Sequence, residues 1–360
     1  MAARQLDALV VTSLPNILYL TNFTGSSAIV VLTADRLLFI TDFRYVTVVN
    51  ERQATPSRCP GFELRVVDGS YDETLATVIK PLARVGFEAE HLSVSRYDWL
   101  KGRLADPDPA AAGSLVATEH VVERARLVKD SYEIDALREA GRRLSAVTRD
   151  VLRGIRRGQT ERDVALDIDS AVRRAGFERA AFETIVAAGP NGALPHAHPG
   201  ERKLTEGDLV VLDFGGVYDS YCVDLTRTVS VGPASPRARE VYDAVRRAHD
   251  VAVAAVKPGA LPSVIDDAAR ASLTAVGMGE AFGHSTGHGL GLEVHESPRV
   301  GRRRPEAREE EEPVVPGFVF TIEPGAYFAG WGGVRIEDDV LVTDSGVELL
   351  TDVSTELVEL

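Results

Sequence analysis

The sequence predicts an α+β protein with two domains, a smaller α/β domain over residues 1–125 and a larger domain over residues 126–360. Three observations support this prediction. The chain has 360 residues, and single hydrophobic cores stop growing at about 250–300 residues. The pattern of apolar residues changes near Val128. Beyond that point, a set of helix boundaries recurs 101 residues further along the chain.

Short apolar runs alternate with helical patterns in the first domain, which is typical of an α/β fold. The strand-like runs are DALVV, SAIVVL, RLLFI and LRVV, and one more is expected near Leu115. Helices are expected over residues 73–83 and from Ser93 or Ser95 to Leu104, because serine is a good N-cap. The proline and glycine content of ADPDPAAAG, residues 105–113, predicts a loop before the domain boundary.

The second domain contains an internal repeat of the form α-α-β-β. Residues 158–176 and 259–277 both have the pattern of a loop glycine, a helix and a terminal glycine. A longer helix precedes each, one starting at a capping box of Asp130 with Glu133 and the other covering residues 236–256. The strands that follow are GDLVVLDFGGVY with VDLTRTVSV, and GFVFTIEPGAY with GVRIEDDVLV. We expect the halves to pack face to face, with the helices outside a shared, curved antiparallel sheet.

Four carboxylates lie inside these otherwise apolar strands, at equivalent places in the two halves. Asp213 and Glu323 each precede a glycine by two residues, and Asp224 and Glu337 fall on the strand that follows. Burying a carboxylate costs several kcal/mol unless it is paired or bound to a metal. If a pseudo-twofold axis relates the halves, the four carboxylates converge, and converging like charges require a cation.

Histidines are the expected partners of these carboxylates. One glycine-rich segment contains His284, His288 and His295, and the glycines beside His288 leave its imidazole reachable. His196 and His295 are available to polarise a substrate carbonyl, although chemistry alone does not separate His196 from His198. Four carboxylates and one imidazole favour Mn²⁺, with Co²⁺, Fe²⁺ or Zn²⁺ as alternatives. So many carboxylates predict two ions, about 3.5–4 Å apart, that activate water.

An arginine on the last of these strands is the expected substrate-binding cation. By strand alternation, Arg335 points to the same side as Glu337 and into the site. Its guanidinium is suited to hold a carbonyl or carboxylate of the substrate. The alternative is a surface ion pair with Asp338 or Asp339.

Five motifs of the second domain occur together and in a specific order: ALPH at 193–196, LDFGGVYDSYCVDLTRTVSVG at 212–232, GHSTGHGLGLEVHE at 283–296, TIEPGAY at 321–327 and GGVRIEDD at 332–339. They resemble the pita-bread metallopeptidases, the family of methionine aminopeptidase, aminopeptidase P and prolidase. TNFTGSSA and ITDFRY in the first domain are similar to the creatinase-like N-terminal domain of bacterial aminopeptidase P-like proteins. The resemblance covers nearly the whole chain and implies the pita-bread fold for residues 126–360.

The resemblance also implies a role for each candidate metal ligand. Asp213 chelates one metal ion, and Asp224 and Glu337 bridge both ions. His288 and Glu323 bind the second ion, and Glu323 passes a proton to the leaving proline nitrogen. All five ligands are present, which speaks against a creatinase-like non-peptidase or a binding protein without metal.

For the substrate site, the resemblance implies that His196 and His295 contact the scissile carbonyl, that His284 lines the site and that Arg335 positions the substrate. We therefore expect a dinuclear Xaa-Pro aminopeptidase, which cleaves peptides with proline at the second position. The alternative is an Xaa-Pro dipeptidase, that is, a prolidase. Methionine aminopeptidase ranks lower because of the first domain and Arg335. A serine hydrolase with Ser285 in GHSTG ranks lowest, because no buried strand precedes this motif.

Composition excludes several other classes of function. A net charge of −14 and a pI near 5.1 argue against non-specific nucleic-acid binding. No apolar run approaches the ~20 residues of a membrane-spanning helix. No secretory signal is visible, and two cysteines fit a reducing cytoplasm. The resemblance implies a homodimer. The charged segment over residues 301–315 predicts a solvated loop, longer than is usual in this family, that affects the site entrance.

Overall fold

The computed structural model describes residues 4–56, 58–105, 113–303 and 311–360. The predicted loop over residues 105–113 lies largely outside these ranges, and so does the middle of the charged segment over residues 301–315. The chain divides into two compact units, Met1–Arg126 and Leu127–Leu360. Within the described ranges, no helix combines the length and the apolar character that crossing a membrane demands.

A six-stranded mixed sheet forms the centre of the first unit, in the order β4-β3-β2-β1-β5-β6. Alternate residues of β1 belong to two different hydrophobic clusters, so both faces of the sheet are covered. Ser93 caps α4 as predicted, whereas α3 begins before residue 73, after a cap at Ser70. The elements are β1 (Ala8–Val11), α1 (Leu14–Thr21), β2 (Ile29–Thr33), β3 (Leu37–Thr41), α2 (Val46–Gln53), β4 (Phe62–Val66), α3 (Tyr71–Ile79), β5 (Arg84–Glu88), α4 (Val94–Leu104), β6 (Ser114–Thr118) and α5 (Glu123–Arg126).

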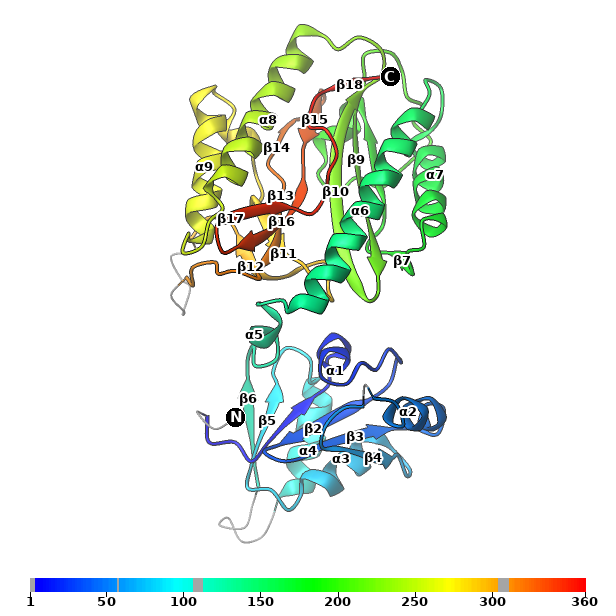
Figure 1. Cartoon of the computed structure of the whole chain (residues 1–360), viewed down its shortest axis with the longest axis vertical. Coiled ribbons are helices and arrows are strands. Elements are labelled where there is room, and N and C mark those ends of the chain that lie inside the picture. The colour runs from blue at the N-terminus through cyan, green and yellow to red at the C-terminus, as the bar shows by residue number, and fades with distance from the viewer. Residues whose placement is uncertain (1–3, 57, 106–112, 304–310) are drawn as a thin grey trace. The chain divides into compact units, whose positions relative to one another are not determined.

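The second unit contains the two predicted helix pairs. They are α6 (Ser131–Gly154) with α7 (Glu161–Arg174), and α8 (Pro236–Ala255) with α9 (Pro262–Ala275). The capping box of Asp130 with Glu133 starts α6 as the sequence predicts. Figure 1 shows one pair on each side of the central strands. This arrangement of helices around paired strands is the predicted α-α-β-β duplication.

The strands between the helix pairs do not form one continuous sheet. Within the described residues they form two five-stranded sheets and a separate two-stranded pair. The expected shared sheet is interrupted, and the isolated bridge between Thr226 and Glu337 connects the two halves. Pro324, which has no N–H to donate, lies between β13 and β14. One sheet contains β7 (Arg179–Ala180), β8 (Ile185–Ala188), β9 (Leu209–Tyr218), β10 (Tyr221–Ser230) and β18 (Val358–Glu359). The other contains β11 (Gly287–Gly289), β12 (Glu296–Val300), β13 (Val319–Ile322), β16 (Asp338–Thr343) and β17 (Gly346–Leu349), and the pair is β14 (Gly325–Phe328) with β15 (Gly332–Arg335).

Candidate metal centre and substrate site

Two of the candidate metal ligands lie on one hairpin of the first half. Asp213 on β9 is paired with Thr226 on β10, and Asp224 is paired with Gly215. Because directly paired residues and residues two apart on a strand share a face, both aspartates project from the same face of the hairpin. Both side chains are buried. The strand register therefore places two candidate carboxylates on one face of the hairpin.

Glu337, between β15 and β16, forms an isolated antiparallel bridge with Thr226 of this hairpin. Its backbone N–H donates to the carbonyl of Thr226 over 3.1 Å. The Thr226 hydroxyl in turn donates to Glu337 Oε2 over 2.5 Å. Thr226 thus fixes the backbone and the carboxylate of Glu337 at once, although the two residues are 111 positions apart in the chain.

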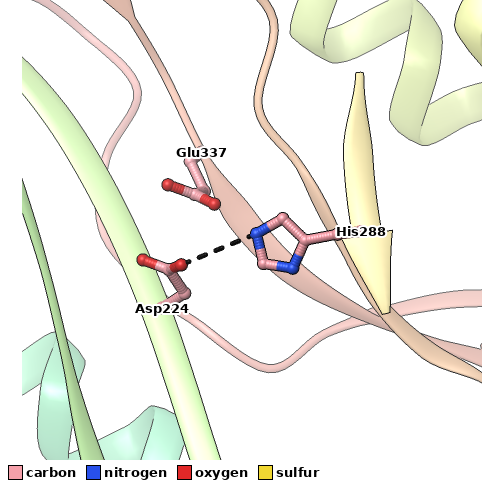
Figure 2. Close-up of side chains that lie close together, drawn as sticks. All are labelled: Asp224, His288 and Glu337. Atoms are coloured by element: carbon pink, nitrogen blue, oxygen red, sulfur yellow. Dashed lines mark ion pairs between the residues drawn. The ribbon is translucent and has the colours of Figure 1, made fainter. Parts of the chain in front are cut away.

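His288, on β11, faces the carboxylates. Its Nε2 lies 3.8 Å from Asp224 Oδ2 and 3.8 Å from Glu323 Oε1. Figure 2 shows Asp224, His288 and Glu337 pointing toward one another from three separate segments. One ligand atom from each of these three residues lies within 4.8 Å of the others. That spacing allows the three side chains to share a metal ion.

The glycines beside His288 let β11 pass between neighbouring strands. A Cβ added to Gly287 would lie 1.8 Å from the carbonyl oxygen of Thr321, and one added to Gly289 would lie 2.1 Å from that of Ser297. Neither separation is possible for real atoms. Any side chain at these two positions would force the backbone on either side of His288 to shift.

The surroundings of the site favour the uncharged forms of its carboxylates and of His288. Burial, followed by the neighbouring carboxylates, raises the pKa values of Asp224 and Glu337 well above their ordinary range. Burial raises the pKa of Glu323 to about 8, with Arg335 working against the shift. Burial also lowers the pKa of His288 to about 4, which leaves the imidazole neutral. Neutral histidine is the form that binds metals.

Three of the candidate ligands each keep one buried carboxylate oxygen that has no hydrogen-bond partner among the described residues. These oxygens are Asp213 Oδ1, Asp224 Oδ1 and Glu337 Oε1. Leaving such atoms unpaired is costly, because buried polar groups lose their water. Free oxygens on three converging acids, beside a neutral imidazole, are the donor set expected for divalent cations. The residues present therefore fit a metal centre.

Arg335 lies inside the site, but protein groups already hold its guanidinium. The side chain is 3% exposed. Its Nη2 donates to Asp213 Oδ2, its Nη1 donates to the Tyr327 hydroxyl over 2.8 Å, and its Nε donates to Thr226 Oγ1 over 3.2 Å. Arg335 thus fixes one candidate ligand and the hydroxyl group beside it.

The alternative of a surface ion pair for Arg335 is wrong. Asp338 and Asp339 are both buried. Asp338 Oδ1 accepts a bond from Arg227 Nη2 over 2.8 Å, and Asp339 Oδ2 accepts one from the backbone N–H of Asp224 over 3.0 Å. Strand alternation alone does not predict these contacts, because the donors to both aspartates come from β10 of the first half.

Arg227 connects segments that carry the candidate ligands, a role that the sequence alone does not indicate. A guanidinium has five N–H donors, and five acceptors are placed around this one. It is 2% exposed and lies on β10, three residues after Asp224. The acceptors are the carbonyls of Thr226, Glu337, Val353 and Ser354 and the carboxylate of Asp338. The residue therefore joins the backbone of Glu337 to β10.

The candidate substrate histidines gather near the same centre. The rings of His288 and His295 are 4.2 Å apart between centroids. His284 Nε2 lies 2.8 Å from the Tyr327 hydroxyl. Burial and then the charge of Arg335 lower the pKa of His284 to about 4, and burial and then His196 lower the pKa of His295. His196 is therefore close enough to affect these imidazoles.

His198 lies apart from this group. It is exposed, and its Nδ1 is 3.1 Å from Glu183 Oε2. The geometry favours His196 over His198, a choice that the sequence left open. Ser285, the candidate serine nucleophile, lies between the short 3₁₀ helix Gly279–Ala281 and β11, so the strand that a nucleophile elbow needs is missing before it.

Fold and site together define a metallopeptidase with an added N-terminal domain. Residues 135–344 match Metallopeptidase family M24, and residues 1–128 match the Creatinase/Prolidase N-terminal domain. The chain belongs to the M24 metallopeptidase family and has a pita-bread catalytic domain. It is a peptidase, as the sequence predicts.

The similarity to known proteins covers nearly the whole chain. It is 38% identical to "Uncharacterized peptidase YqhT" of Bacillus subtilis, over 98% of this chain and 96% of the relative. It is 32% identical to "Xaa-Pro dipeptidase" of Pyrococcus furiosus, over 99% of this chain and 97% of the relative. Among solved structures, an Xaa-Pro dipeptidase from Bacillus anthracis has a TM-score of 0.91 at 36% identity, covering 100% of this chain and 96% of that one. An X-Pro aminopeptidase from Thermotoga maritima has a TM-score of 0.85 at 32% identity, covering 99% and 98%.

Proposed function

We propose that this protein is an Xaa-Pro dipeptidase that depends on two divalent metal ions. The observation that carries the proposal is the cluster of buried carboxylates around His288, with three oxygens that have no partner. Relatives named as Xaa-Pro dipeptidases support the dipeptide substrate. The sequence favoured an aminopeptidase P, and the dipeptidase alternative fits these relatives better. Aminopeptidase P remains the second candidate because one similar structure is an X-Pro aminopeptidase.

Five residues are proposed to hold the ions, which we infer to be Mn²⁺: Asp213, Asp224, His288, Glu323 and Glu337. Bound metals of this kind lower the pKa of water and so supply a nucleophile at neutral pH. Asp224 and Glu337 come from opposite halves and each keeps one oxygen without a partner, so both would hold the ions, in the bridging role that the family resemblance implies. Arg335 keeps Asp213 oriented through its bond to Oδ2.

The neighbouring side chains act on the substrate. We assign His196 and His295 to the carbonyl of the scissile bond, where a donated hydrogen bond stabilises the developing oxyanion. Glu323 passes a proton to the leaving proline nitrogen, and His284 lines the site beside Tyr327. A dedicated enzyme is needed because proline fixes φ and lacks the N–H that other peptidases use for orientation.

Hydrolysis of three peptides by metal-stripped protein, with and without added Mn²⁺, tests this proposal. A dipeptidase cleaves Ala-Pro faster than Ala-Pro-Ala and leaves Ala-Ala-Ala intact, and only with metal. Faster cleavage of Ala-Pro-Ala would instead favour aminopeptidase P. If none of the three were cleaved with metal present, the Xaa-Pro assignment would be wrong.

A further inference from the structure

A fully buried carboxylate in the first half has no role in the proposed reaction. Glu161 is the first residue of α7 and is 0% exposed. Its Oε1 accepts the backbone N–H of Ala188 over 2.8 Å and the Asn191 amide over 2.9 Å. Its Oε2 accepts the backbone N–H of Gly200 over 3.1 Å. The helix N-terminus favours a negative charge at this position.

The hydrogen bonds of Glu161 hold both ends of one loop, at Ala188 and at Gly200. Ala188 is the last residue of β8. The chain then runs through residues 189–199 to Gly200, which lies against the first turn of α7. At that point the backbone N–H of Arg162 donates to the carbonyl of Gly200 over 3.1 Å. The loop between the two fastened ends carries His196. We call residues 188–200 the His196 loop.

The middle of the His196 loop rests on β15. A Cβ added to Gly333 would lie 2.2 Å from the carbonyl oxygen of Gly192, so the two backbones are in close contact. Arg335 Nη1 also donates to the carbonyl of Pro195 over 3.4 Å. The His196 side chain itself is exposed. Its position is therefore set by the backbone of the loop rather than by packing of the ring.

The second half uses a similar arrangement. Asp266 on α9 is 0% exposed, and its Oδ1 accepts the backbone N–H of Thr286 over 3.1 Å and the Thr286 hydroxyl over 2.8 Å. Asp266 also pairs with Arg270, one turn further along α9, which donates to the carbonyls of Phe282 and His284. In each half, a buried acid on the second helix holds the backbone of a segment that carries a candidate substrate histidine.

We propose that Glu161 is a positioning residue that acts on the substrate through His196, and that Asp266 acts in the same way through His284. This inference rests on the proposed function, since it assumes that both histidines face the substrate. Neither acid touches the metal centre. Losing Glu161 is therefore expected to reduce substrate turnover while leaving metal affinity unchanged. The loss of Asp266 is expected to lower metal affinity as well, because the carbonyl of its partner Thr286 accepts the backbone N–H of the candidate ligand Glu323 over 2.7 Å. A small displacement of a group that contacts the reacting carbonyl is enough to slow the reaction strongly.

Glu161→Gln is the informative substitution. A glutamine keeps the volume but presents an NH₂ to the N–H of either Ala188 or Gly200, so two donors face each other. We expect kcat/KM for Ala-Pro to fall about tenfold or more. The affinity for Mn²⁺, measured by titration calorimetry, should stay within about twofold of wild type. Glu206→Gln is the matched control, because Glu206 is exposed and pairs with Arg157 at the surface.

A double-mutant cycle separates positioning from general support of the fold. If Glu161 acts through His196, then Glu161→Gln has almost no further effect on kcat/KM in a His196→Ala background. An equal fold-loss in both backgrounds, or no loss in either, would overturn the proposal. Asn191→Ala, which removes one donor to Glu161, replaces Glu161→Gln in the cycle if that variant does not fold. Asp266→Asn with His284→Ala gives the equivalent cycle in the second half.

Failure of the proposed function has a different signature. In that case the wild-type protein, loaded with Mn²⁺, cleaves neither Ala-Pro nor Ala-Pro-Ala. Hydrogen exchange at the His196 loop then tests whether Glu161 holds the ends of this loop. Faster exchange of the amides of Ala188 and Gly200 in Glu161→Gln would support this role, and unchanged exchange would overturn it.

Discussion

The two halves of the catalytic domain follow one plan, yet their strands differ. In the first half, β9 and β10 are continuous strands of ten residues each, paired without interruption. In the second half, the equivalent strands are each broken into two. β13 and β14 are separated at Glu323 and Pro324, and β15 and β16 are separated at Ile336 and Glu337. The breaks fall at the candidate ligands of this half.

This difference shows how a duplicated fold builds an asymmetric site. Asp213 and Asp224 take their positions from their own hairpin. Glu337 instead takes its position from Thr226 and Arg227 of the opposite half, through bonds to both its backbone and its carboxylate. The first half therefore supplies the groups that hold Glu337 of the second half. Changes in the second half therefore test how the site is assembled.

Substitution of the two proposed bridging ligands should have the largest effect. We expect Glu337→Gln and Asp224→Asn each to reduce Xaa-Pro hydrolysis by about 10³-fold or more, because each removes a ligand charge from the metal centre. Without metal at pH 8, both variants should unfold at a higher temperature than wild type, because repulsion among buried carboxylates decreases. Metal titration and thermal unfolding with and without Mn²⁺ measure both effects. Wild-type activity of either variant at saturating Mn²⁺ would rule out a bridging role for that residue.

His284 of the second half predicts a smaller, pH-dependent effect. The pKa of His284 is lowered from 6.5 to about 4, by burial and then by Arg335. Its neutral form therefore contributes stability above pH 6.5, and this contribution is lost as the pH falls toward 4. In His284→Gln, the free energy of unfolding should depend less steeply on pH across that window.

Urea unfolding of the metal-free protein at several pH values between 4 and 7 measures these slopes. His198→Gln is the control, because His198 is exposed and lies apart from the centre. Equal slopes in wild type and His284→Gln would contradict the prediction.

The smallest effect is expected where β13 and β14 are separated. Pro324→Ala restores a backbone N–H and adds conformational freedom to the unfolded chain. We expect the free energy of unfolding to fall by about 0.4–1 kcal/mol. Metal affinity should stay near that of wild type, because the N–H of Glu323 still donates to the carbonyl of Thr286 and the bonds from Thr226 and Arg227 still hold Glu337. A large loss of metal affinity would show that the proline itself maintains the break.

Much of this architecture could be predicted from the sequence because local signals and duplication agree. The capping box of Asp130 with Glu133 marks the start of α6. The spacing of Asp213 and Glu323 before glycines indicates the repeat, and burial of charge indicates the metal centre. Each of these inferences needs only neighbouring residues and a general physical cost.

The supporting contacts could not be predicted, because they join distant segments. Nothing near Thr226 in the sequence indicates that its hydroxyl bonds Glu337, or that Arg227 reaches Val353 and Ser354. The pairing of Arg335 with Asp213 and Tyr327 depends on a packing arrangement that strand alternation does not contain. A buried arginine in an apolar strand is the one signal that could have indicated Arg227.

The long sequence separation between Thr226 and Glu337 has a consequence for folding kinetics. Contacts between residues far apart in the chain form late, because closing a long loop costs entropy before the contact rewards it. The carboxylates are therefore expected to meet only after each half has acquired most of its structure. Interactions that are absent from the folding transition state slow unfolding without speeding folding. Divalent ions should accordingly prolong the lifetime of the native protein while leaving its refolding rate almost unchanged.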